Sequence, residues 1–135
     1  MRLHAHPGAC QDCHRIDDED YALLAPLPEL CSRSGCHAEL ASGKPHLHGP
    51  FALGDCRACH LPHSSAASGL LTWPRTRLCL SCHPSGALRT CPSAADPERS
   101  ECSACHDAHG GVDALFRIAS DDAAAHPARP RSAQR

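Results

Sequence analysis

The sequence predicts a small domain of mostly irregular structure with short α-helices and little or no sheet. Leu, Ile, Val and Phe together number only 20 of 135 residues, and chains below about 20% of these residues rarely build a side-chain core. Twelve Pro and nine Gly leave few long helical windows, and no segment alternates with the period of two typical of strands. Ordering the backbone costs roughly 1–2 kcal/mol per residue, so something other than side chains must supply the core.

Cysteine and histidine are the unusual residues, with eleven Cys and twelve His. Ten of the cysteines belong to five motifs in which a histidine directly follows the second cysteine of a pair. The second cysteines are spaced 23 residues apart throughout, which is the mark of an internal repeat. The motifs are CQDCH (10–14), CSRSGCH (31–37), CRACH (56–60), CLSCH (79–83) and CSACH (102–106).

A longer repeat of 46 residues pairs these motifs. YALLAPLPELC (21–31) and GLLTWPRTRLC (69–79) share Leu-Leu, a proline and Leu-Cys, whereas CRACHLPH and CSACHDAH share a histidine three residues after the motif histidine. The chain therefore holds about two and a half copies, and we expect residues 1–125 to form a single domain and 126–135 a flexible tail. Each motif is expected on a short helical turn, with further short helices at 19–25 and 112–119.

The motif C-x-x-C-H is the attachment signature of c-type haem. Two thiols one helical turn apart join one porphyrin as thioethers, and the adjacent imidazole becomes the proximal iron ligand. Zinc is the alternative, but zinc sites use a second ligand pair further along and do not require a histidine directly after each cysteine pair. The sequence thus predicts five c-type haems, which also supply the missing core; CSRSGCH is the weakest match because of its longer cysteine gap. The predicted thioether residues are Cys10, Cys13, Cys31, Cys36, Cys56, Cys59, Cys79, Cys82, Cys102 and Cys105, and the predicted proximal ligands are His14, His37, His60, His83 and His106.

The second axial ligands must come from the histidines outside the motifs, because the only methionine is Met1. His63 follows His60 by three residues, so both point to roughly the same side of a helical turn. We therefore expect His63 to ligate a neighbouring haem, and the same holds for His109. Cys91 lies outside every motif and is interpreted as a free thiol. The candidate distal ligands are His63, His109, His48 (favoured over His46), His126 and one of His6 and His4.

The segment HGPFALGDCRACHLPHSS (48–65) resembles the doubled-CXXCH multihaem cytochromes. The resemblance is good over about 30–65, weaker over 78–111, and covers 4–15 as a half-unit. It implies low-potential haems with two histidine ligands in a bent chain that passes electrons, as in small pentahaem periplasmic electron donors. It also implies distal-ligand roles for His48, His63 and His109.

Two departures from this pattern affect the ligands. Ala94 occupies the position in the second motif pair that His48 occupies in the first. Asp17 occupies the position in the first half-unit where His63 and His109 stand later. The missing ligands are expected from the ends of the chain or from another subunit, or the positions stay without a histidine.

Electron transfer between redox partner proteins is the function that these motifs favour. The alternative is a subunit of an extracellular cytochrome filament with haem ligation between subunits, or of a membrane-associated cytochrome complex. A multihaem reductase is disfavoured, because 135 residues shared among five haems leave little chain for a substrate pocket. Nitrite reductases of the resembled family also carry a lysine in one motif, and the only lysine here, Lys44, lies outside all five.

Charge and hydrophobicity bear on location. The net charge of −2 and the lack of a basic run give no sign of nucleic-acid binding, and no apolar run approaches the ~20 residues of a transmembrane helix. The start MRLHAHPGAC lacks the apolar region of a signal peptide. Because haem attachment of this type takes place outside the cytoplasmic membrane, we nevertheless expect an exported protein that is periplasmic or extracellular.

Overall fold

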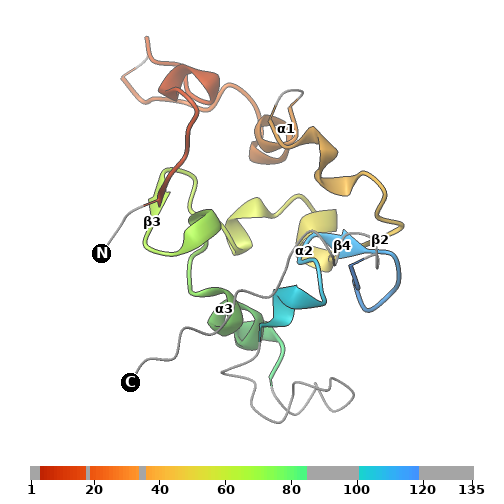
Figure 1. Cartoon of the computed structure of the whole chain (residues 1–135). Coiled ribbons are helices and arrows are strands. Elements are labelled where there is room, and N and C mark those ends of the chain that lie inside the picture. The colour runs from red at the N-terminus through yellow and green to blue at the C-terminus, as the bar shows by residue number, and fades with distance from the viewer. Residues whose placement is uncertain (1–3, 18, 34–35, 85–100, 119–135) are drawn as a thin grey trace, which may run out of the picture.

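The computed structural model describes residues 4–17, 19–33, 36–84 and 101–118. The chain is mostly irregular, with short helices and two very small strand pairs, as the composition predicted (Figure 1). The α-helices are α1 (Leu27–Cys31), α2 (Gly49–Ala52) and α3 (Arg75–Cys82); the 3₁₀ turns are η1 (Cys10–Asp12), η2 (Ala38–Ala41), η3 (Cys56–Ala58), η4 (Ser68–Leu70) and η8 (Cys102–Ala104); the strands are β1 (His4–Ala5), β2 (His46–Leu47), β3 (Ser64–Ser65) and β4 (Gly110–Gly111).

Proline sets the start of the two helices that carry the even-numbered motifs. Pro26 caps α1 and Pro74 caps α3. The fixed φ of proline suits a helix start, where its missing N–H group is not needed. Both helices then run into the next motif, so that Cys31 is the last residue of α1, and Cys79 and Cys82 lie one turn apart within α3.

The odd-numbered motifs lie on the 3₁₀ turns η1, η3 and η8, and each is followed by a tight reversal of the chain. Tyr21, Leu70 and Phe116 have left-handed φ values of 47°, 56° and 56°. The prediction of helices at 19–25 and 112–119 is wrong for the described residues there, because the left-handed residue interrupts the helical path and the chain pairs back on the motif. The bridges are His14 with Leu23, His60 with Leu71, and His106 with Arg117.

Two antiparallel strand pairs join segments that are far apart in the sequence. β1 pairs with β3, matching His4 with Ser65, and β2 pairs with β4, matching His46 with Gly111. Figure 1 shows β4, in the blue part of the chain, against β2. Each pair is only two residues long, and the other strand-like pairings in the described chain are the three isolated bridges.

Side chains make almost no core. Among the described residues, Leu30 is the only buried hydrophobic residue, at 4% exposure, and no side chain is completely buried. Large apolar side chains stay exposed, among them Tyr21 and Trp73. In the described part of the chain, no helix has the length and hydrophobicity to span a bilayer. The proposed boundary between residues 1–125 and the tail 126–135 stays a prediction, because it falls outside the described residues.

Candidate haem sites

All five motifs share one backbone hydrogen bond, in which the histidine N–H donates to the carbonyl of the first cysteine. CSRSGCH keeps this bond in spite of its two additional residues, with His37 donating to Cys31 at 3.2 Å. The longer gap therefore does not change how the motif histidine is placed relative to the first cysteine. The other bonds are His14 to Cys10 at 2.9 Å, His60 to Cys56 at 3.0 Å, His83 to Cys79 at 2.9 Å and His106 to Cys102 at 3.0 Å.

The rings of the odd-motif histidines are held by a carbonyl of the following turn. A histidine that donates from Nδ1 keeps the lone pair of Nε2 for a metal, and the bond also fixes the ring orientation. These carbonyls were not predicted from the sequence, because main-chain acceptors leave no side-chain signature. The contacts are His14 Nδ1 to Tyr21 O at 2.5 Å, His60 Nδ1 to Gly69 O at 2.8 Å and His106 Nδ1 to Leu115 O at 2.7 Å.

Four of the five motif histidines face a second histidine from a distant part of the chain. His63 lies against His14 rather than joining the haem site of His60, and His109 lies against His60 rather than that of His106. The rings of His63 and His109 thus each lie beside the histidine of a different motif, and the crossed ligation expected for them stays a prediction. The ring-centre distances are 5.9 Å for His14 and His63, 6.3 Å for His37 and His6, 6.2 Å for His60 and His109, and 5.9 Å for His83 and His48.

These distances fit a metal ion between the rings. Two imidazoles on opposite sides of one iron, each with a metal–nitrogen bond of about 2 Å, have ring centres about 6 Å apart. The residues at each motif also offer the two thiols that thioether attachment requires, and none of those ten thiols is in a disulfide. The donor set and the ring spacing therefore suit a covalently bound haem with two histidine ligands.

The structure gives less information on the remaining candidate ligands. His4 lies in β1, next to His6 in sequence, and only its backbone is described. His46 lies in β2 and is exposed. His106 faces no second imidazole among the described residues, and both His126 and Cys91 lie outside them.

The four distal candidates form two pairs, which we call ligand clasps. The first clasp consists of β1, His6, His63 and β3, with His6 N–H donating to His63 O at 3.0 Å. The second consists of β2, His48, His109 and β4, with His48 N–H donating to His109 O at 3.1 Å. In each clasp one histidine directly follows the earlier strand, and the other directly precedes the later strand.

Asp107 distinguishes His109 from the other distal candidates. Its Oδ1 accepts the backbone N–H of His109 at 2.8 Å and lies 3.4 Å from the Nδ1 of that residue, and its Oδ2 lies 3.3 Å from Lys44 Nζ. Burial lowers the pKa of His109, although the carboxylate of Asp107 acts in the opposite direction. The neutral ring, which is the form that binds metal, is therefore favoured, and the carboxylate orients it. His63 has Leu61 in the equivalent place.

Cysteines of successive motifs lie next to one another. Burial and, to a lesser degree, the nearby Cys56 raise the pKa of Cys31 to about 11. Burial likewise raises the pKa of Cys79, followed by the effect of Cys102. The attachment points of motifs two and three therefore adjoin, as do those of motifs four and five.

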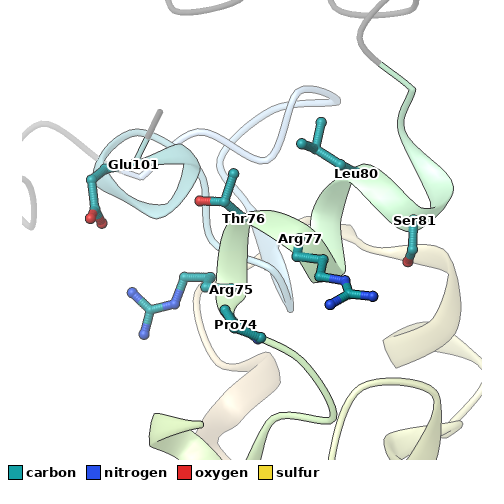
Figure 2. Close-up of a pocket in the computed structure, with 7 residues that line it drawn as sticks. All are labelled: Pro74, Arg75, Thr76, Arg77, Leu80, Ser81 and Glu101. Atoms are coloured by element: carbon teal, nitrogen blue, oxygen red, sulfur yellow. The ribbon is translucent and has the colours of Figure 1, made fainter. Parts of the chain in front are cut away.

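A hollow of about 710 Å³ lies along α3 (Figure 2). Arg75 and Arg77 extend from the start of the helix in this view. Arg75 Nη1 donates to Ser103 Oγ at 2.8 Å and so connects α3 to η8, while the guanidinium of Arg77 lies 3.8 Å from the ring centre of Trp73. The lining residues are Pro74, Arg75, Thr76, Arg77, Leu80, Ser81 and Glu101. In the described residues no group of three or more His, Cys, Asp or Glu side chains is gathered as a metal site.

Comparison with known protein families adds to this geometry. Residues 48–88 match the family model described as the doubled CXXCH motif. This range holds motifs three and four together with His48 and His63. The match supports a c-type cytochrome-like multihaem family and indicates covalent haem binding and electron transfer in general. Searches of curated proteins and of solved structures found no match.

Proposed function

We propose that this protein is an electron-transfer cytochrome that carries five covalently bound c-type haems between redox partner proteins outside the cytoplasmic membrane. The observation that carries the proposal is the pairing of four motif histidines with four distant histidines at 5.9–6.3 Å. This pairing would give four irons a histidine on each side. The model match over residues 48–88 supports the same chemistry.

The chain's residues would hold the haems in fixed roles. Each motif contributes two thioether cysteines and a proximal histidine, whose Nε2 is directed to the metal by the bond at Nδ1 in motifs one, three and five. When bound, each haem supplies one-electron iron(II)/iron(III) chemistry. The ring contacts support His63 as the residue that would be the distal ligand for motif one, His6 for motif two, His109 for motif three and His48 for motif four.

Two further features suit a carrier of electrons. Neighbouring cysteines of motifs two and three, and of motifs four and five, would attach consecutive haems close together. Arg75 and Arg77 are suited to bind haem propionates, because a guanidinium pairs with a carboxylate through two parallel hydrogen bonds. Four irons held by two histidines each would also have no vacant position for a substrate, which argues against a reductase site at motifs one to four.

The proposal is tested by producing the chain in a host that attaches c-type haem to exported proteins. We expect an intact mass that includes five haems, a haemochrome spectrum with the same stoichiometry, reversible reduction and reoxidation, and little carbon monoxide binding at the irons of motifs one to four. A matched Cys36→Ala variant should lose one thioether bond, at motif two alone. A chain that carries zinc, or no covalent haem, would refute the proposal.

The fifth site favours assembly as a second candidate function. His106 is oriented by Leu115 O like the other odd-motif histidines, yet it faces no imidazole in the described part of the chain. His126, a candidate distal ligand that the sequence assigns to no particular motif, lies outside that part. If a neighbouring subunit supplies the ligand instead, sedimentation and negative-stain images will show concentration-dependent filaments. A strictly monomeric protein with all five irons six-coordinate would exclude this function.

A further inference from the structure

The two ligand clasps each connect the distal ligands of two different motifs. His6 faces motif two and His63 faces motif one, whereas His48 faces motif four and His109 faces motif three. Within a clasp the two ligand residues are joined directly by a backbone hydrogen bond, of 3.0 Å in the first and 3.1 Å in the second. A displacement of either strand therefore moves both histidines.

We propose that each clasp is a coupled ligation unit, in which the β2–β4 pairing sets the distal ligation of motifs three and four together and the β1–β3 pairing sets that of motifs one and two. This inference rests on the proposed function, because it assigns the four histidines to haem iron. It adds that the backbone pairing, and not each histidine alone, determines whether the two sites are six-coordinate.

Gly110 is the residue that makes the second clasp testable without touching a ligand. A Cβ on Gly110 would collide with His46 O and would lie 3.1 Å from the Cα of Leu47. Both obstacles belong to the backbone of β2, so no side-chain movement relieves the clash. Gly110→Ala should therefore force β2 and β4 apart and break the bond between His48 and His109.

The first clasp supplies a matched control. Ser64 precedes Gly110 by 46 residues and occupies the same place at the start of β3. Ser64 already carries a Cβ in its pairing with Ala5. Ser64→Ala therefore changes the same position of the repeat without introducing the steric conflict.

The experiment compares the spin states of the haems in four proteins: the unmodified chain, Gly110→Ala, Ser64→Ala and His109→Ala. Electron paramagnetic resonance and resonance Raman spectra count the low-spin haems in each protein. Relative to the unmodified chain, two haems should leave the low-spin state in Gly110→Ala, one in His109→Ala and none in Ser64→Ala. Added imidazole should restore the low-spin signal. The inference is overturned if only one haem, or none, leaves the low-spin state in Gly110→Ala. It is also overturned if the haems that leave the low-spin state are those of motifs one and two.

A second measurement tests the coupled ligation if Gly110→Ala does not fold or does not acquire its haems. In the unmodified, reduced protein, NMR can follow the ring resonances of His48 and His109 during a denaturant titration. Coupled ligation predicts one midpoint for both residues, and two separate midpoints contradict it. The haem count by mass spectrometry is independent of either result, so failure of the proposed function is distinguished from failure of this inference.

Discussion

Asp107 and Leu61 differ chemically although they occupy equivalent positions of the repeat. Asp107 lies beside the ring of His109, while Leu61 lies at the corresponding position before His63. A carboxylate next to a metal-bound histidine makes the ring a stronger electron donor and stabilises the oxidised metal. The haem between His60 and His109 should therefore have a lower midpoint potential than the haem between His14 and His63.

The substitution Asp107→Asn tests this difference at a single residue. We expect the midpoint potential of one haem to rise, by on the order of 50 mV, because hydrogen bonds to a ligand histidine and nearby charges alter haem potentials. Haem-resolved redox titration by NMR measures the shift. The reciprocal Leu61→Asp should lower the potential of the motif-one haem, and an unchanged potential in both variants would contradict the assigned role of Asp107.

At the residue level, the candidate sites can be identified from the sequence because the run Cys-x-x-Cys-His is made of adjacent residues. The three-residue spacing of His60 and His63 predicts that they serve different haems, and that assignment stays a prediction. The ring contact between His6 and His37 could not be predicted, because only tertiary pairing brings these distant residues together. The distal-ligand role of His126, which lies outside the described residues, also stays a prediction.

Among the local elements, the turn after motif five depends on Asp113. Its Oδ1 accepts the N–H of Leu115 at 2.9 Å, and its Oδ2 accepts Arg117 Nε at 2.5 Å. This turn presents Leu115 O to the ring of His106. The hydrogen bond from Arg117 lowers the pKa of Asp113 below its ordinary value of 3.8.

This lowered pKa predicts how the turn responds to acid. The stabilising contribution of Asp113 is present above pH 3.8 and is lost as the pH falls through the lower folded-state pKa. Arg117→Gln should raise the pKa of Asp113 towards 3.8, as measured by a carboxyl NMR titration of the reduced protein. Arg75→Gln serves as the control, because it removes a guanidinium that is bonded to Ser103 instead, and it should leave the pKa of Asp113 unchanged. If the pKa of Asp113 is unchanged in Arg117→Gln, a group other than Arg117 lowers it.

The elements were predictable to the extent that local residues determine them. The prolines before Leu-Cys, which in the sequence serve only to identify the repeat, prove to cap α1 and α3, since proline favours a helix start. The segments 19–25 and 112–118 formed turns instead, because a left-handed residue and a bridge to the motif histidine outweigh helix propensity there. The strand pairs could not be predicted, because two residues carry no measurable period and their partners are over 50 residues away.

At the scale of the whole molecule, the described chain is an open framework whose parts are joined by the two clasps. Leu30 is its only buried hydrophobic residue, and no described side chain is completely buried. Such a framework cannot offset a backbone ordering cost of roughly 1–2 kcal/mol per residue by side-chain burial alone. We therefore expect the haems to form the core and the histidine pairs to close the framework around them.

The most direct test of this central claim compares the same chain with and without covalent haem. Haem-free protein, made without haem attachment and kept reduced, should have a circular dichroism spectrum typical of an unfolded chain and no cooperative thermal transition. The haem-loaded protein should melt cooperatively. A cooperative transition in the haem-free chain would contradict the account, because side chains alone would then be building the core.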